Sequence, residues 1–455
     1  MLASGSINNR LKARPWRRPT ATARCLPPEP GAARRASAGG PGNSPVAFAP
    51  CAGISCRSGK EEGRVTRRTP IRPRIGITGS YGGLNLGDEA ILKSIITQLR
   101  ATMPVDIRVF SRNAEDTRRR HDVEQALPVR DMSRAEARDA VAELDLLIFG
   151  GGGILYDGEA ELYLREVSLA HELNVPVIIY AVSAGPLRSR TVRERVAEAL
   201  SKAAIVTVRD RPGRRLLEDI GVRREVLLTA DPALLLEPEP LNGDALLREG
   251  LDLSRRLVGF SVREPGPAAP EIDVAHYHAL LANAADFIVD RWQANIVFVP
   301  MERGQMDVQH SHAVISRMQN ANHATVLKGD YSAGQVLSLI GHFQFCVGMR
   351  LHILIFSALQ HVPFIALPYS PKVTGLLQDL GIDVPPLDNV NTGRLLALID
   401  QSWDSRATLK EHIAQRLPQL QDRARETHAL LVQLIRDLGL HRRTDTANTQ
   451  GSCPF

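Results

Sequence analysis

Long hydrophobic runs and paired cysteines are both lacking in this chain of 455 residues. No apolar run approaches the ~20 residues that a transmembrane helix needs, and no apolar stretch follows the first charges, as one does in a secretory signal. Of the five cysteines, only Cys346 lies away from the two ends of the chain, so we expect no disulfide framework. These shortages favour a protein of a reducing compartment.

Several signatures of chemistry are absent as well. The glycine-rich stretch Gly79–Leu92 lacks the Gly-Lys-Ser/Thr of a P-loop, and no G-x-G-x-x-G opens the helix behind it. No G-x-S-x-G is present, and no cysteine has the setting of a nucleophile. Four histidines (His276, His278, His310 and His312) have no Cys or carboxylate partner at ligand spacing, and the stretch around His310 is predicted to be a polar helix face. We therefore expect no metal site.

Charge is distributed unevenly along the chain. Residues 1–74 contain 15 Lys and Arg but three Asp and Glu, whereas the remainder contains 41 basic and 47 acidic residues. The acidic remainder gives no reason to expect nucleic-acid binding. Residues 1–73 are rich in Pro, Gly, Ala, Ser and Arg without periodicity, and we predict that they are disordered, as is a tail at 441–455. A start codon assigned too far upstream is our first explanation of residues 1–73, and a transit peptide is the second.

From Arg74 onward, predicted strands and helices alternate. The predicted strands are 75–78, 105–110, 144–149, 177–182 and 204–208, followed by 257–262, 295–300, 325–328 and 363–367 after a linker at 237–256. Helices are predicted at 89–100, 161–173, 192–202, 275–291, 332–342, 351–359 and 406–438. The alternation predicts an α/β fold of two Rossmann-like domains, 74–240 and 255–385, with C-terminal helices at 386–440. Ligands of such sheets bind beyond the carboxyl ends of the strands, here in a cleft between the domains.

The stretch Phe345–Val373 places three chemically active residues on two strand-to-helix connections. Arg350 and His352 begin a helix, where free backbone N–H groups favour anions. Lys372 follows the next buried strand. Any one of them alone would be taken for a surface charge or a core histidine, but two cations and a titratable imidazole at neighbouring strand ends together predict a site for a small, strongly anionic substrate.

The loop Gly79–Leu92 is the first of three further candidates for ligand binding. Asn85, Gly87 and Asp88 lie where its helix begins, and its four glycines exceed what a capping turn needs. We therefore favour a ligand role for these three residues over the alternative, in which Asp88 is only the helix N-cap.

Two other strand ends add candidates. Gly151, Gly152 and Gly153 follow a buried strand, so their amides are expected at the edge of the sheet, where they can bind a phosphate or a sugar hydroxyl. Close packing between the domains explains these glycines equally well. Arg209 and Arg263 each follow a strand at the expected cleft, and the planar fork of Arg209 suits a carboxylate or a phosphate.

Taken together, these loops resemble the polysaccharide pyruvyl transferase family. The matching segments are GGLNLGDEAIL, LLIFGGGGIL, the strand ending in VRD, DPALLL, VGMRLHILIFSAL and LPYSPKV, which span about Ile75 to Leu380. The resemblance implies a fold similar to that of type B glycosyltransferases (GT-B). It also implies transfer of a pyruvyl group from phosphoenolpyruvate to a sugar of a cell-wall or surface polysaccharide, or of its lipid-linked precursor, leaving a pyruvate ketal and phosphate. Met301–Asp307 matches the family less clearly, and residues 1–74 have no counterpart in it.

The resemblance also implies roles for individual residues. Arg350 and His352 match the family's R-L-H motif and are the expected catalytic residues, Lys372 matches its Y-x-P-K motif, and Arg209 its strand-end arginine. Imidazole titrates near neutral pH, so His352 is expected to act first as general acid and later as general base. The three cations would hold phosphoenolpyruvate, which bears roughly −2.5 to −3 charges near neutral pH.

No cofactor or metal is implied, because phosphoenolpyruvate is itself the donor substrate. We expect the protein in the cytoplasm, in peripheral contact with the inner face of the membrane where the acceptor is lipid-linked. Two other functions stay open. A nucleotide-sugar-dependent glycosyltransferase on the same architecture would also place basic residues and a helix N-terminus at a diphosphate. The second alternative is a non-catalytic protein that retains the fold.

Overall fold

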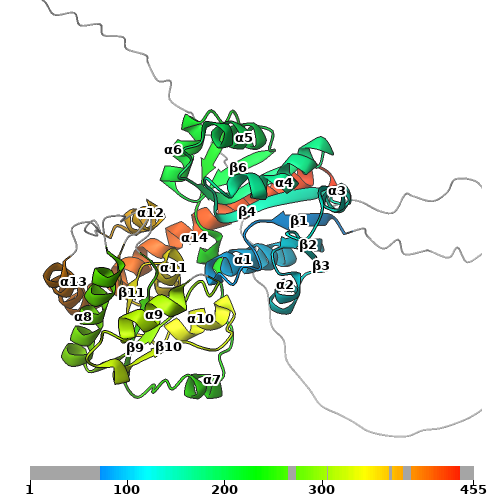
Figure 1. Ribbon diagram of the computed structural model, residues 1–455. Helices are drawn as coiled ribbons and strands as arrows, with labels where there is room; N and C mark the ends of the chain where they lie inside the picture. The colour runs from blue at the N-terminus through cyan, green and yellow to red at the C-terminus, as the bar shows by residue number, and fades with distance from the viewer. Residues whose placement is uncertain (1–71, 265–272, 305, 368–370, 383–390, 441–455) are drawn as a thin grey trace, which may run out of the picture. The chain divides into compact units, whose positions relative to one another are not determined.

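The computed structural model describes residues 72–264, 273–304, 306–367, 371–382 and 391–440. The predictions for residues 1–71 and for the tail at 441–455 therefore lie outside the described residues. The described residues belong to one compact unit that contains two β-sheets, both parallel throughout and with helices packed around them (Figure 1).

The first sheet has seven strands in the order β3-β2-β1-β4-β5-β6-β7. The strands are β1 (Arg74–Thr78), β2 (Asp106–Ser111), β3 (Gln125–Pro128), β4 (Leu146–Leu155), β5 (Val177–Ala184), β6 (Ile205–Val208) and β7 (Val226–Leu228). They alternate with α1 (Leu86–Thr102), α2 (Ala114–Arg120), α3 (Arg134–Ala142), α4 (Ala160–Glu172), α5 (Arg190–Ser201) and α6 (Arg211–Asp219), and η1 (Pro232–Leu235) and α7 (Gly243–Arg248) follow. The strand order reverses between β1 and β4, and the crevice at such a switch point is where ligands of these sheets bind.

The second sheet has five strands in the order β10-β9-β8-β11-β12. The strands are β8 (Arg256–Ser261), β9 (Ala294–Phe298), β10 (Ala324–Val326), β11 (Phe345–Gly348) and β12 (Phe364–Ala366). The helices are α8 (Val274–Trp292), α9 (Asp307–Ile315), η3 (Ala321–His323), α10 (Ala333–Ile340), α11 (Leu351–Leu359), α12 (Pro371–Leu380), α13 (Thr392–Asp404) and α14 (Arg406–Asp437). The switch point lies between β8 and β11, so Arg350 and His352 follow a strand that borders it.

Apolar periodicity explains why these segments pack as they do. The central strands are apolar on both faces, as expected of a parallel sheet covered by helices on each side. Helix α1 has one apolar stripe that includes Ile91, Ile95 and Leu99, and all three side chains are fully buried. The helix that the sequence predicts over 89–100 is therefore confirmed.

The last helix, α14, joins the two sheets. It packs against α12 of the second half and against η1 and β5 of the first (Figure 1). Near its middle, Gln421 Nε2 donates to the Leu234 carbonyl at 3.1 Å, and Thr427 Oγ1 donates to Thr229 Oγ1 at 2.8 Å. The C-terminal helices thus close over the first sheet as well as the second.

Candidate active site

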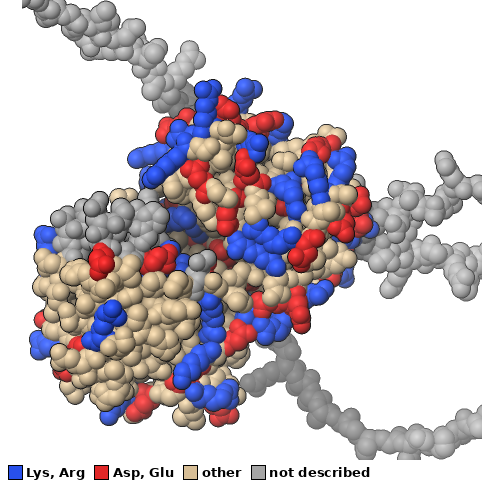
Figure 2. Space-filling model, viewed as in Figure 1, with Lys and Arg blue, Asp and Glu red and all other residues tan. Residues whose placement is uncertain are grey.

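A cavity of about 370 Å³ opens where strands of both sheets reach their carboxyl ends, and basic side chains surround a hollow in this face of the molecule (Figure 2). The first half of the chain contributes Ser80, Asn85, Asp88, Arg112, Gly153, Ile154, Tyr156, Glu159, Tyr163 and Arg209. The second half contributes Arg263, Met301, Glu302, Arg350, Leu351, His352 and Lys372. Eight of the eleven predicted site residues therefore line one cavity; Gly87, Gly151 and Gly152 are not among its lining residues.

His352 is backed by a buried carboxylate. It is the second residue of α11, and its Nε2 lies 3.6 Å from Oδ2 of Asp231 while making no hydrogen bond to another described residue. Asp231 also accepts hydrogen bonds from the Ala233 amide, at 3.0 Å, and from Nη1 of Arg209. Burial alone would raise the pKa of Asp231, but Arg209 and His352 hold it well below its usual range. The ionised carboxylate can therefore orient the imidazole and stabilise its protonated form.

Lys372 brings a buried ammonium group into the cavity from the first turn of α12. It forms no ion pair with a described carboxylate, and its Nζ lies so close to Gly153 that any Cβ at that position would overlap it. Burial, and to a smaller extent Arg209, lower the pKa of Lys372 to about 8, while Asp210 and Asp88 oppose the shift. An unpaired, desolvated cation of this kind favours an anionic ligand.

Asp88, in the first turn of α1, places a buried carboxyl group at the cavity. Its Oδ1 faces Gly152, and its side chain lies among His352, Glu302 and Arg209. Burial raises the pKa of Asp88 to about 6, although His352 acts in the opposite direction. A carboxyl group that titrates near neutral pH is suited to accept a proton.

Arg350 is the N-cap residue of α11, and two carboxylates hold its guanidinium. Nε donates to Asp307 Oδ2 at 3.1 Å, Nη2 donates to Asp307 Oδ1 at 2.5 Å, and Nη1 donates to Glu302 Oε2 at 2.6 Å. Asp307 is fully buried and also accepts from the amides of Met301 and Glu302. The side chain of Arg350 is therefore fixed at the cavity wall before any substrate enters.

The segment that matched the family least clearly is a structural link. The Leu86 amide donates to the Met301 carbonyl at 2.8 Å, and the Arg303 amide donates to the Leu84 carbonyl at 3.1 Å. Asn85 and Glu302 form an isolated antiparallel bridge between these two bonds. Met301–Arg303 therefore attaches the wall around Arg350 to the glycine-rich loop of the first sheet.

Asp88 is not the N-cap of α1, so the alternative that the sequence left open for this residue is wrong. The helix begins at Leu86, and Oδ1 of Asn85 caps it by accepting from the amides of Gly87 and Asp88. Asp88 is thereby free to face the cavity. Gly87 lies against the His352 ring, where a Cβ would overlap the imidazole.

The four glycines after Phe149 are not a loop, which corrects the predicted end of that strand. Strand β4 continues through them to Leu155, and Gly150 and Gly152 pair with Tyr180 and Val182 of β5. Gly151 and Gly152 are buried, and Gly153 alone of the set lines the cavity. Close packing is what the structure shows for Gly150, whose carbonyl accepts from the Tyr81 hydroxyl at 2.5 Å.

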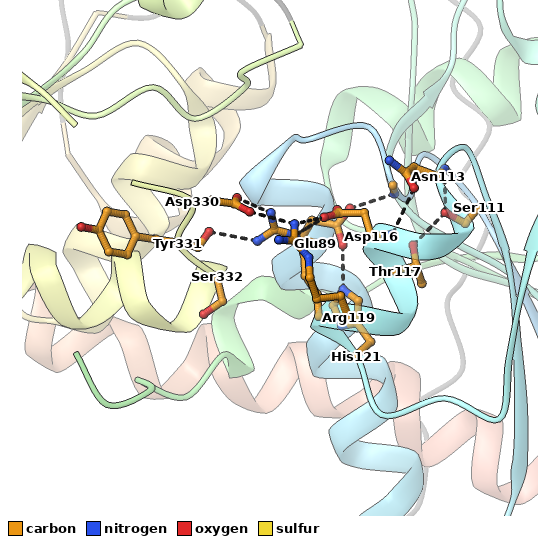
Figure 3. Close-up of polar contacts among 12 residues, drawn as sticks. Glu89, Ser111, Asn113, Asp116, Thr117, Arg119, His121, Asp330, Tyr331 and Ser332 are labelled. Atoms are coloured by element: carbon orange, nitrogen blue, oxygen red, sulfur yellow. Dashed lines mark hydrogen bonds and ion pairs between the residues drawn. The ribbon is translucent and has the colours of Figure 1, made fainter. Parts of the chain in front are cut away.

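A buried polar network supports the glycine-rich loop from behind (Figure 3). Glu89 accepts from the Gly82 amide at 2.8 Å and lies 2.6 Å from Nε2 of His121. Farther out, Arg119 and Arg120 at the end of α2 reach Asp330 of the second half of the chain. The loop that presents Asn85 and Asp88 is thus held through α2 as well as through Met301–Arg303.

The histidines outside the cavity do not form a metal site. Among the described residues, no group of three or more His, Cys, Asp or Glu side chains could hold a metal ion. The predicted polar helix face around His310 is wrong, because His310 and Ser311 are buried. His310 Nδ1 of α9 instead lies 2.8 Å from His278 Nε2 of α8, where the two helices pack together.

Sequence reasoning missed several residues of the site. Asp231 had a usable signal, because it opens the family-like segment DPALLL immediately after a strand. Glu302 and Asp307 lie in the segment that matches the family less clearly, and no sequence signal marked them. Four further residues that were missed form one wall of the cavity. Arg112, Tyr156 and Glu159 lie in the strand-to-helix connections after β2 and β4, and Tyr163 lies in α4.

Two parallel sheets with a basic cavity at their switch points define an enzyme-like α/β fold of the GT-B kind. Residues 85–371 match the model of a family described as polysaccharide pyruvyl transferase, and the chain belongs to this family. One relative is the amylovoran biosynthesis protein AmsJ of Erwinia amylovora, which is 19% identical over 294 residues, 62% of this chain and 71% of AmsJ. The predicted family is therefore confirmed, and membership implies transferase activity on a polysaccharide substrate.

Solved structures confirm the predicted fold. The S. aureus MnaA–UDP complex has a TM-score of 0.58 at 9% identity and covers 83% of this chain and 100% of its own. A putative UDP-N-acetylglucosamine 2-epimerase from Listeria monocytogenes has a TM-score of 0.56 at 11% identity and covers 82% of this chain and 99% of its own. Sucrose-phosphate synthase from Thermosynechococcus elongatus has a TM-score of 0.53 at 14% identity and covers 80% of this chain and 100% of its own. Separately, every helix in the described ranges is too short or too polar to cross a bilayer.

Proposed function

We propose that this protein transfers the pyruvyl group of phosphoenolpyruvate to two hydroxyls of a sugar in a cell-wall or surface polysaccharide, or in its lipid-linked precursor. The observation that carries the proposal is the cavity in which Arg209, Arg263 and Lys372 lie beside a histidine backed by Asp231. Phosphoenolpyruvate bears roughly −2.5 to −3 charges, so it matches a small cavity with an excess of cations. The reaction takes place in the cytoplasm, at the inner face of the membrane when the acceptor is lipid-linked.

The reaction needs one proton on carbon and two hydroxyl additions. The protonated imidazole of His352 gives its proton to the methylene carbon, which becomes a methyl group and leaves an oxocarbenium-like centre at C2. One sugar hydroxyl adds to C2, and Asp88 takes its proton. Asp88 gives its proton to the phosphate as the C2–O bond to the phosphate breaks. The second hydroxyl then adds to C2 while the neutral His352 takes its proton. The products are a pyruvate ketal and phosphate.

The cations of the cavity bind different ends of phosphoenolpyruvate. Lys372 and Arg209 offset the charge of the phosphate as it leaves, and Arg263 and Arg350 hold the carboxylate end. Asp307 and Glu302 fix the guanidinium of Arg350, so Arg350 is a preorganised part of the cavity wall. The amide of Gly153 lies beside Lys372 at the same end of the cavity.

Incubation with phosphoenolpyruvate and a set of saccharides tests the function directly. We expect release of inorganic phosphate together with a saccharide product that gains the mass of one pyruvate minus one water. A nucleotide-sugar glycosyltransferase would instead release a nucleoside diphosphate, and a non-catalytic protein would release neither. Either of these results would overturn the proposal.

The pH dependence follows from two shifted groups. Asp88 must be ionised to accept a proton, and burial raises its pKa to about 6, so activity is expected to rise through that pH. Lys372 must be protonated to hold the donor, and burial lowers its pKa to about 8, so kcat/KM for phosphoenolpyruvate should fall above that pH. Lys372→Arg keeps its charge at high pH and should remove the alkaline limb. An unchanged alkaline limb in this variant would show that Lys372 is not the group responsible.

A further inference from the structure

One wall of the cavity has no part in holding the donor. Its residues come from two connections of the first sheet: Arg112 follows β2, whereas Tyr156 and Glu159 lie between β4 and α4. The donor side has an excess of cations, but this wall pairs one guanidinium with one carboxylate. Nη2 of Arg112 donates to Glu159 Oε2 at 3.2 Å. A charge-compensated wall favours a neutral ligand over a second anion.

The wall is built as a rigid surface. Nη2 of Arg112 also donates to the Tyr163 hydroxyl, and the Arg112 guanidinium lies over the Tyr163 ring, 5.6 Å from its centroid. Arg130 lies over the same ring at 5.5 Å. The Arg112 side chain is 29% exposed and that of Glu159 is 35% exposed, whereas Tyr163 is buried. Arg112 and Glu159 are therefore held in place from behind while their polar atoms reach the cavity.

The chemistry of these groups suits a sugar ring. A carboxylate accepts hydrogen bonds from sugar hydroxyls, a guanidinium donates to their oxygens, and the half-buried ring of Tyr156 offers an apolar face for C–H groups. Few, well-placed polar groups around an apolar surface are the usual composition of a small-molecule site.

This wall is also connected to the reacting groups. Ser80 lies beside both the Asp88 carboxyl and the Tyr163 hydroxyl. Along the chain, Gly153, which touches Lys372, is followed by Ile154 and Tyr156 on the same cavity surface. A ring bound to this wall would therefore present its hydroxyls towards Asp88.

We propose that Arg112, Tyr156 and Glu159 form the subsite for the sugar ring that receives the pyruvyl group. The subsite binds a neutral hexopyranoside through its hydroxyls and directs one of them to Asp88 and a second to His352. This inference rests on the proposed function, because it assigns the acceptor of that reaction, but saccharide binding can be measured without turnover.

The test uses methyl glycosides of glucose, galactose, mannose and their N-acetyl derivatives as probes. Their binding to the full-length protein is followed by saturation-transfer NMR, and phosphoenolpyruvate binding by calorimetry. Glu159→Gln and Tyr156→Ala are expected to weaken binding of the preferred glycoside at least about tenfold while changing the Kd for phosphoenolpyruvate less than about twofold. Glu161→Gln is the matched control, because Glu161 lies two residues after Glu159, in the first turn of α4, but pairs with Arg195 outside the cavity.

Three results would overturn the subsite. Glycoside binding that is unchanged in both variants would do so, as would loss of phosphoenolpyruvate binding in parallel with that of the glycoside, or absence of glycoside binding by the wild-type protein. Failure of the proposed function has a different outcome: glycoside binding would depend on Glu159 and Tyr156, but no phosphate would be released from phosphoenolpyruvate.

Discussion

Replacing His352 by Ala is expected to lower turnover of phosphoenolpyruvate by about 10²–10⁴-fold, the usual contribution of a general acid–base group. In the proposed mechanism the imidazole transfers the proton to the methylene carbon, and no other described histidine lines the cavity. In heavy water, the amount of product with a deuterated methyl group should fall by the same factor. Steady-state kinetics and mass spectrometry measure the two effects.

His342→Ala is the matched control for this substitution. His342 lies exposed just after α10, so its loss should leave turnover, deuterium incorporation and thermal unfolding as in the wild type. A His352→Ala protein that folds normally and retains more than about a tenth of wild-type turnover would remove His352 from the proton-transfer step.

Replacing Asp307 by Ala is expected to destabilise the fold by about 3–5 kcal/mol, the cost of leaving a buried charge without its partner. Asp307 is fully buried and accepts two hydrogen bonds from Arg350 and two from the amides of Met301 and Glu302. Chemical denaturation followed by circular dichroism measures the loss. The apparent KM for phosphoenolpyruvate should rise as well, because Arg350 loses its fixed orientation.

Glu302→Ala provides the comparison, since Glu302 binds the same guanidinium through Nη1 but is 18% exposed and holds no backbone amide in the described structure. Its loss should cost less than that of Asp307. Equal destabilisation in the two variants would contradict the structural role assigned to Asp307.

The sequence alone was sufficient for residues whose role depends on local structure. Arg350 and His352 could be placed because a short apolar strand, a turn and a helical repeat surround them, and the carboxyl ends of parallel strands meet at one edge. Lys372 followed from the next strand in the same way. The helical stripe of α1 was equally clear, because long apolar periodicity is a strong signal.

Residues whose role depends on distant contacts could not be placed. Asp307 meets Arg350 across 43 positions of sequence, and nothing near Asp307 marks it as a partner. Strands β3 and β7 are four and three residues long, too short for a periodic pattern. The extension of β4 was missed because glycine weakens strands. Only the pairing with β5 and the close approach of Tyr81, Ile91 and Lys372 show why four glycines in a row are tolerated.

At Gly87, the second half of the chain limits which residue the first half can carry. Its backbone is helical and, unlike Gly82 or Gly151, it has no positive φ, so α1 itself would accept almost any residue there. Glycine is among the poorest helix formers, and alanine would strengthen the helix. The neighbour that forbids alanine is the His352 imidazole, which belongs to the second sheet. A substitution that stabilised α1 at position 87 would therefore displace His352, the side chain proposed to transfer the proton. Selection for thermal stability cannot act on this position without affecting the proposed active site.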